Sequence, residues 1–186
     1  MKEKVILLLL ALSIGLFFFD QYAGKPKSPI NKESSQTTEQ IKTGTEHGQK
    51  ALDFGLKTRE NQNIKLSDYK GKNVFVNFWA SWCPPCRAEM PHIQDFYEEY
   101  KGKDVAVLSV NLTHLDKDLD TIHQFVQKNG LTFPVIYDER RIVNDLYKVN
   151  TIPTSYVVDK DGVIRERIVG PVSKERLEKL FSHLPN

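Results

Sequence analysis

The chain has 186 residues, of which 40% are hydrophobic and 27% are charged, and its formal net charge is +2. This length suits one globular domain with an additional segment. The small net charge, with no basic block and no stripe of Lys and Arg interleaved with aromatic residues, argues against a nucleic-acid partner.

Residues 1–23 are predicted to be a signal anchor. Lys2 and Lys4 precede an apolar run, Val5–Phe19, that would span roughly 22 Å as a helix. The two lysines favour an N-terminus inside the cell. The chain is therefore expected to cross the cell membrane once and to hold its remaining residues on the extracytoplasmic face. A cleaved signal peptide is the alternative, although residues 21–23 form a poor cleavage site.

Residues 24–50 are predicted to be a flexible polar linker. They contain no aromatic residue, and their only strong apolar side chains are Ile30 and Ile41. Such a segment buries too little surface to offset the entropy cost of ordering it. Regular apolar patterning starts at about Ala51, so residues 51–186 are expected to form one folded domain with a single core.

The strands of this domain are expected as a small hairpin followed by buried strands. Short apolar stretches at 53–56 and 64–66 flank a polar turn and indicate the hairpin. The nearly continuous apolar run Val74–Trp79 indicates a strand that is covered on both faces. Further strands are expected at 104–110, 133–137, 155–158 and 163–169.

Helices are expected after Cys83, between Leu119 and Gly130, at about 142–147 and after Ser173. In the second of these, Leu119 and Phe125 are expected to face inward. Asp116, shortly before it, is interpreted as part of an acidic helix start. Strands and helices alternate before a closing hairpin and helix, a pattern typical of an α/β fold with a mixed central sheet flanked by helices.

The only two cysteines, Cys83 and Cys86, lie at the corner between the apolar strand and the first helix. A thiol with a pKa of about 8.5 is mostly protonated at neutral pH, and the thiolate is the attacking species. A helix N-terminus favours the thiolate at Cys83, whereas Cys86 lies one turn further in and is more shielded. We therefore expect Cys83 to attack a substrate disulfide and Cys86 to resolve the mixed disulfide. A structural zinc site is disfavoured because this spacing supplies only two of four ligands.

Two stretches, Asn77–Cys86 and Thr151–Thr154, resemble the thioredoxin superfamily. Within it, the chain is similar to the membrane-anchored TlpA/ResA-like thiol–disulfide oxidoreductases, and the resemblance covers the whole predicted domain. It implies a thioredoxin-like fold with an N-terminal hairpin extension and a central insertion between residues 102 and 134. It also implies a redox disulfide between Cys83 and Cys86, and neither a metal nor a cofactor.

Glu89 is the third candidate catalytic residue. Thioredoxins carry a buried aspartate for proton transfer at the position of Asn77, and an asparagine cannot ionise. The TlpA/ResA-like group has a glutamate three residues after the second cysteine, and Glu89 matches it. Partial burial would raise the pKa of Glu89 into a range suited to proton transfer. A solvated glutamate on the helix surface is the alternative.

The substrate-binding residues follow mainly from the resemblance. It implies that Pro153 follows a cis peptide bond and faces the two sulfurs, with Ile152 beside it. Trp82, Pro84 and Pro85 surround the nucleophile and are expected to contact the substrate. A packing role for Trp82 is the alternative.

The resemblance implies an extracytoplasmic reductant of disulfides in client proteins. Clients in the family include apocytochrome c and, in spore-formers, an envelope-assembly protein, and a CcdA-type membrane thiol-transfer protein donates the electrons. Three alternatives stay open: a disulfide-forming oxidant, a thiol peroxidase of the same fold, and a copper carrier that uses the two thiols.

Overall fold

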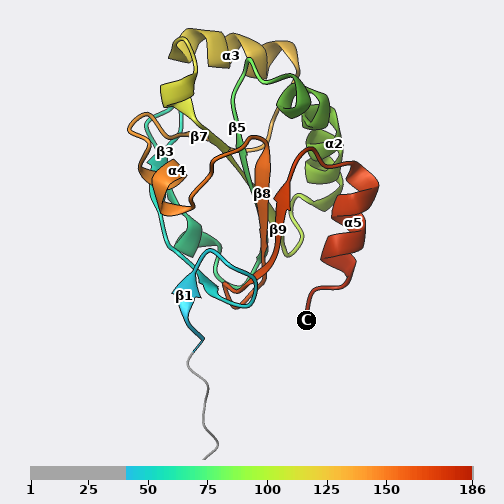
Figure 1. Ribbon diagram of the computed structural model, residues 1–186. Helices are drawn as coiled ribbons and strands as arrows, with labels where there is room; N and C mark the ends of the chain where they lie inside the picture. The colour runs from blue at the N-terminus through green and yellow to red at the C-terminus, as the bar shows by residue number, and fades with distance from the viewer. Residues whose placement is uncertain (1–40, 186) are drawn as a thin grey trace, which may run out of the picture. The chain divides into compact units, whose positions relative to one another are not determined.

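The computed structural model describes residues 41–185, and its centre is a seven-stranded mixed sheet with the strand order β4-β3-β7-β6-β5-β8-β9 (Figure 1). The strands are β3 (Gly55–Lys57), β4 (Asn63–Lys65), β5 (Asn73–Trp79), β6 (Val105–Asn111), β7 (Val135–Tyr137), β8 (Thr154–Val158) and β9 (Ile164–Val169). β5, β6 and β7 are parallel neighbours, and the remaining pairs are antiparallel. The expected mixed sheet, with its N-terminal hairpin β3–β4, is confirmed.

Strand β5 lies inside the sheet, between β6 and β8, and all seven of its residues are buried. Successive side chains of a strand point to opposite faces. Phe75 and Trp79 accordingly belong to one core cluster, whereas Val74, Val76 and Phe78 belong to a second. This explains why the β5 sequence is apolar almost without interruption.

Helices cover both faces of the sheet. They are α2 (Pro84–Tyr100), α3 (Leu119–Lys128), α4 (Ile142–Leu146) and α5 (Lys174–Ser182), with short 3₁₀ turns η1 (Leu66–Tyr69) and η2 (Thr113–Leu115). α2, α3 and α5 pack on the face of Phe75 and Trp79. α4, η1 and the hairpin pack on the opposite face.

Helix α3 departs from one expectation. Leu119, which was expected to face inward, is 38% exposed, whereas Ile122 and Phe125 are buried. Leu119 is the first residue of the helix, and Asp118 caps it by accepting a hydrogen bond from the backbone N–H of Thr121 (2.7 Å). The apolar spacing therefore described the helix interior correctly but not its first turn.

The folded domain begins earlier than its apolar pattern indicates. β1 (Thr43–Gly44) pairs with β2 (Lys50–Ala51), and Gly48 N–H donates to the carbonyl of Ile164 in β9 (2.8 Å). Ile164 N–H donates in turn to the carbonyl of Gln49 (2.8 Å). The predicted linker boundary at residue 50 is thus wrong for residues 43–50. Backbone hydrogen bonds hold this segment to the edge strand β9. Because every residue other than proline carries the same backbone groups, composition does not predict these bonds.

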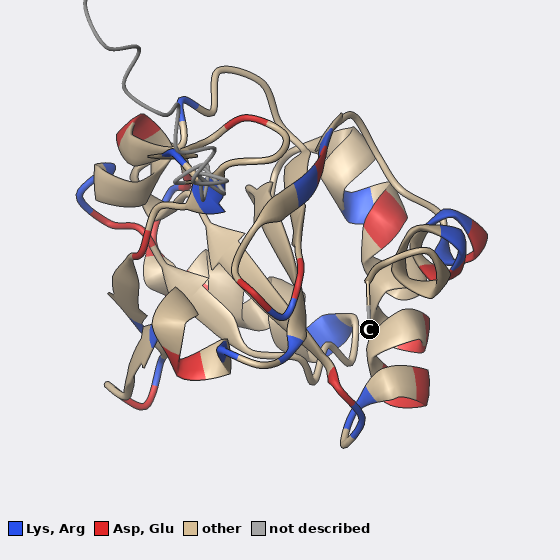
Figure 2. Cartoon of the chain, turned by 90° about the horizontal axis from the view of Figure 1, so that it is seen from below, with Lys and Arg blue, Asp and Glu red and all other residues tan. Residues whose placement is uncertain are grey.

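The predicted signal anchor, residues 1–23, and residues 24–40 of the predicted linker lie outside the described residues. Among residues 41–185, no helix combines the length and the apolar character needed to cross a bilayer. Lys and Arg positions and Asp and Glu positions are interspersed along the ribbon in Figure 2, in keeping with the small net charge of the chain.

Candidate redox site

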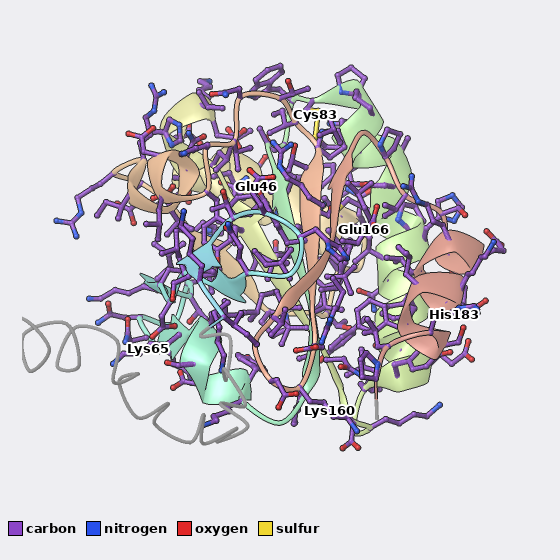
Figure 3. All side chains as sticks on the ribbon, turned by 60° about the horizontal axis from the view of Figure 1, so that its bottom comes forward. Glu46, Lys65, Cys83, Lys160, Glu166 and His183 are labelled. Carbon is purple, nitrogen blue, oxygen red and sulfur yellow. A yellow bond between two sulfur atoms is a disulfide. The ribbon has the colours of Figure 1, made fainter. Side chains whose placement is uncertain are left out.

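A disulfide joins Cys83 and Cys86 at the corner between β5 and α2. Figure 3 shows Cys83 at one end of the sheet, far from Lys160 in the β8–β9 turn. Cys83 is the N-cap of α2, and its sulfur accepts a hydrogen bond from Cys86 N–H (3.4 Å). Pro84 and Pro85 fill the first two helical positions, where a missing N–H costs nothing. The helix therefore begins at the sulfur that it can stabilise as a thiolate.

The two cysteines differ in their surroundings. Both residues are buried, with Cys83 3% and Cys86 0% exposed, but Cys83 is flanked by exposed residues. Pro84 and Pro85 are exposed beside it, and Trp82 is 57% exposed. This exposed surface adjoins Cys83, whereas Cys86 is fully buried in the core. This arrangement agrees with the expected roles of attacking and resolving thiol.

The peptide bond between Ile152 and Pro153 is cis, as the resemblance implied. The carbonyl oxygen of Ile152 lies 3.9 Å from the Cys83 sulfur, so this loop borders the disulfide directly. Pro153 is buried, and Ile152 is half-buried. The Pro153 carbonyl accepts a hydrogen bond from Gly170 N–H (2.9 Å), which ties this loop to the end of β9.

Trp82 and Trp79 have separate roles in the structure. Trp79 is fully buried, whereas the Trp82 indole N–H donates to the carbonyl of Leu115 in η2 (2.9 Å). Leu115 is itself 45% exposed. Trp82 therefore presents an oriented aromatic surface next to the nucleophile, and it is not part of the core.

Asp116 supports the segment that precedes the nucleophile, a contact that sequence reading missed. Its carboxylate accepts hydrogen bonds from the backbone N–H and the hydroxyl of Ser81, and from the Asn111 side chain (3.0 Å). Asp116 was interpreted as part of an acidic helix start, but Asp118 alone caps α3. No local pattern reveals this contact, since Ser81 lies 35 positions away.

Glu89 lies one helical turn beyond Cys86 and is only 1% exposed. Its carboxylate accepts hydrogen bonds from the Asn77 side-chain amide (2.8 Å) and from Val172 N–H (3.0 Å). Burial raises the pKa of Glu89 to about 7, although these two hydrogen bonds act in the opposite direction. A carboxyl group with this pKa exchanges protons readily at neutral pH. The alternative of a solvated surface glutamate is excluded.

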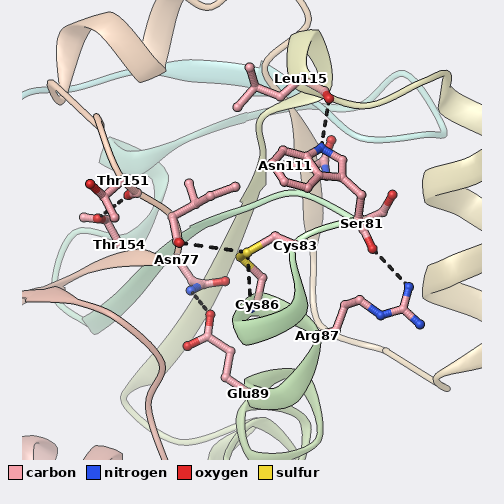
Figure 4. Close-up of a disulfide and its surroundings, with 12 residues drawn as sticks. Asn77, Ser81, Cys83, Cys86, Arg87, Glu89, Asn111, Leu115, Thr151 and Thr154 are labelled. Atoms are coloured by element: carbon pink, nitrogen blue, oxygen red, sulfur yellow. Dashed lines mark hydrogen bonds between the residues drawn. A yellow bond between two sulfur atoms is a disulfide. The ribbon is translucent and has the colours of Figure 1, made fainter.

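Figure 4 shows the side chains that surround the disulfide. Asn77 and Glu89 lie on one side of the two cysteines, and Arg87 points away on another. The Arg87 guanidinium donates to the carbonyl of Ser81 (3.2 Å) and lies over the Phe125 ring. The arrangement places a disulfide between a buried carboxyl group with a raised pKa and an exposed rim formed by Trp82, Pro84 and Pro85.

Comparison with known protein families gives one family match. The model of the AhpC/TSA family matches residues 47–167. Two bacterial relatives cover most of the chain. The thioredoxin-like protein YneN of Bacillus subtilis (strain 168) is 41% identical over 144 residues, which are 77% of this chain and 84% of the relative. The thiol-disulfide oxidoreductase ResA of Bacillus thuringiensis (strain Al Hakam) is 35% identical over 175 residues, which are 94% of this chain and 90% of the relative.

Two solved structures are also similar to this chain in fold and in sequence. StoA from Bacillus subtilis superposes with a TM-score of 0.64 at 33% identity, covering 70% of this chain and 96% of StoA. A protein from Chlorobium tepidum described as a putative thiol:disulfide interchange protein DsbE superposes with a TM-score of 0.66 at 33% identity, covering 76% and 96%. Both similarities extend over nearly the full length of the compared structures.

Proposed function

Because the chain belongs to the AhpC/TSA family of thioredoxin-like proteins and is a thiol–disulfide oxidoreductase of the ResA type, we propose that it reduces disulfides in client proteins outside the cytoplasm. Cys83 attacks the client disulfide, and Cys86 resolves the mixed disulfide. Glu89 accepts the proton of the resolving thiol. The exposed rim of Trp82, Pro84 and Pro85 receives the client, opposite Ile152 and Pro153.

The buried carboxyl group of Glu89 is the observation that supports a reductant. A redox pair becomes a strong oxidant when its reduced form is stabilised. In its ionised form, a carboxylate one turn from Cys86 acts in the other direction, because a nearby negative charge disfavours a thiolate. The hydrogen bonds that Glu89 accepts come from neutral groups, so they leave its charge uncompensated. This favours a low reduction potential.

The reduction potential tests this direction. Equilibration with glutathione or dithiothreitol buffers, followed by trapping of the thiols, measures it for the Cys83–Cys86 pair. We expect a value below about −220 mV, in the range of reductants such as thioredoxin. A value near about −120 mV, which is typical of a strong oxidant, would replace the proposed reductant by a disulfide-forming enzyme.

A membrane tether is proposed from the N-terminal sequence. Similarity to the Bacillus thuringiensis ResA extends over 175 residues, more than residues 41–185 contain, so it includes part of the N-terminal segment. The apolar run Val5–Phe19 would hold the enzyme in the cell membrane with its domain outside. Deletion of residues 2–23 should release active protein from the membrane fraction. Retention of the deleted form in washed membranes would contradict the tether.

The proposed partners follow from this location. Electrons would come from a CcdA-type membrane thiol-transfer protein, and the client would be an apocytochrome c or a spore-envelope assembly protein. An apocytochrome c presents the sequence Cys-x-x-Cys-His. Reduction of a synthetic peptide with this sequence in its oxidised form is therefore expected to be faster than reduction of oxidised glutathione. Equal rates for the two substrates would point to another client.

A further inference from the structure

Asn77 has one polar atom that the disulfide form leaves unused. The residue is fully buried in β5, and its side-chain N–H groups donate to the Glu89 carboxylate (2.8 Å) and to the Ser155 hydroxyl oxygen (3.0 Å). Its carbonyl oxygen Oδ1 is buried and has no hydrogen-bond partner among residues 41–185. Buried acceptors without a donor cost free energy, so this atom needs an explanation.

The orientation of the Asn77 amide follows from its neighbours. Turning the amide over would place Oδ1 against the Glu89 carboxyl group, and the ionised form of Glu89 offers that oxygen no hydrogen. The amide therefore keeps its nitrogen on Glu89 and points Oδ1 elsewhere.

The strand geometry directs Asn77 toward the redox helix. Side chains two positions apart in a strand share a face, so Asn77 lies on the same face as Phe75 and Trp79. Those two residues pack in one cluster with Cys83 and Cys86. Figure 4 shows the Asn77 amide between the Glu89 carboxylate and the cysteines.

We propose that Asn77 is the positioning residue of the resolving thiol: in the dithiol state, the Cys86 S–H group donates a hydrogen bond to Asn77 Oδ1. Reduction of the disulfide creates the donor that this buried acceptor lacks. The same amide donates to Glu89, so it holds the thiol next to its proton acceptor. The proposal rests on Cys86 as the resolving thiol, and it is independent of the direction of electron flow.

In the reductant direction, Cys86 resolves the mixed disulfide between Cys83 and the client. In the mixed disulfide, the Cys86 S–H bond rotates away from Asn77 Oδ1 and the thiol gives its proton to Glu89, and the Cys86 sulfur forms a bond with the Cys83 sulfur. The bond between Cys83 and the client sulfur breaks, and its electron pair leaves with the client thiolate. The cysteine pair is oxidised by two electrons, and the client is reduced by two. Asn77 gains and loses no proton.

The groups around Glu89 restrict what can titrate in this step. The two groups that donate hydrogen bonds to Glu89, the Asn77 amide from β5 and the Val172 N–H from the β9–α5 loop, are neutral. The ionisable groups of the step are therefore Glu89, the two cysteines of α2 and the leaving thiol of the client. With the same client in every variant, a change in the pH dependence of resolution reports on Glu89 and the two cysteines.

A vibrational measurement tests the hydrogen bond directly and requires no activity. In the Cys83→Ser chain, Cys86 is the only thiol, and its infrared S–H stretching band shifts to lower frequency when it donates. Asn77→Leu keeps the side-chain volume and removes the acceptor, so the band should move to the position of a free thiol. Asn73→Leu is the matched control, because Asn73 is also buried in β5 with an unpartnered Oδ1. A band at the free position without the Asn77 substitution overturns the proposal.

A kinetic measurement separates positioning from packing. Asn77→Leu should slow resolution of a preformed mixed disulfide about fivefold, the factor of one ordinary hydrogen bond. The first attack by Cys83, measured in the Cys86→Ser chain, should keep its rate. Equal slowing of both steps would indicate a packing role and contradict the proposal.

A second variant covers the case in which Asn77→Leu does not fold. Asn77→Asp keeps the size and the acceptor but places a second carboxyl group against Glu89. The two carboxyls would share a proton, so the pH midpoint of resolution should rise. Asn73→Asp should leave that midpoint in place. An unchanged midpoint in Asn77→Asp overturns the proposal, whereas failure of the reductant assignment would appear only in the reduction potential.

Discussion

The Glu89 carboxylate accepts a hydrogen bond from the backbone N–H of Val172 (3.0 Å), which joins the redox helix α2 to the loop between β9 and α5. The pKa of Glu89 is raised from 4.5 to about 7, chiefly by burial. The folded protein therefore holds this proton more tightly than the unfolded chain does. Stability from the protonated carboxyl is complete at low pH and is lost as the pH rises from about 4.5 through about 7, by about 3 kcal/mol.

Glu89→Gln should remove this pH dependence. Urea unfolding of the oxidised protein between pH 4.5 and pH 8 measures it, and the stability of the variant should fall by about 3 kcal/mol less than that of the parent. Asp95→Asn serves as the control, since Asp95 is an exposed carboxylate on the same helix. A pH slope that stays the same in Glu89→Gln would show that Glu89 does not titrate in this range.

The division of labour between the cysteines gives a second prediction. Cys86→Ser should form a persistent mixed disulfide with a client, because the attacking thiol remains and the resolving thiol is lost. The matched variant Cys83→Ser should form little, since its remaining thiol is fully buried. Non-reducing electrophoresis with an oxidised Cys-x-x-Cys-His peptide distinguishes the two. A stable adduct with Cys83→Ser alone would reverse the assigned roles.

Sequence patterns predicted the elements of this fold well and its contacts less well. The apolar run of β5 and the helical spacing around Ile122 and Phe125 are local, so their strand and helix were predicted correctly. The cis bond at Pro153 and the choice of Glu89 as a candidate site residue required a family resemblance. Glu89 and Val172 are 83 positions apart, and no spacing rule connects them.

Two features were missed for different physical reasons. Asp116 lies in an acidic stretch that reads as a helix start, but its hydrogen bonds go to Ser81. Residues 43–50 have too few apolar side chains to suggest order, yet backbone pairing with Ile164 holds part of this segment in place. Both contacts are made by polar groups. The hydrophobic pattern predicts helices and strands but does not predict contacts of this kind.

The exposed ring of Trp82 gives a third prediction, about client binding. Trp82→Ala should lower kcat/KM about tenfold for a protein client, because it removes an oriented aromatic side chain from the rim. The rate with oxidised glutathione, which is too small to cover the rim, should change little. Ile142→Ala is the control, since Ile142 is 50% exposed on α4, which packs on the other face of the sheet. If the rates with the protein client and with oxidised glutathione fall equally, Trp82 affects the reactivity of the cysteines and not the binding of the client.

The contact between Asp116 and Ser81 gives a fourth prediction, about stability. Asp116→Asn replaces a charged acceptor of three hydrogen bonds by an amide that accepts through one oxygen. The free energy of unfolding should fall by about 1.5–3 kcal/mol, as expected for hydrogen bonds to a charged group. Asp120→Asn, an exposed position in the first turn of α3, should stay within about 0.5 kcal/mol. If Asp116→Asn lowers the free energy of unfolding by less than about 0.5 kcal/mol, the contact between Asp116 and Ser81 does not stabilise the fold.

The pairing of residues 48–50 with the start of β9 has a consequence for access. β9 runs parallel to β5, because both are antiparallel to β8, so Ile164 lies at the end of the sheet away from Cys83. A group attached ahead of residue 41, such as a membrane anchor or an immobilising resin, is therefore joined to the domain at the end of the sheet opposite the disulfide. Residues 48–50, which connect such a group to the domain, lie at the other end of the sheet from Cys83.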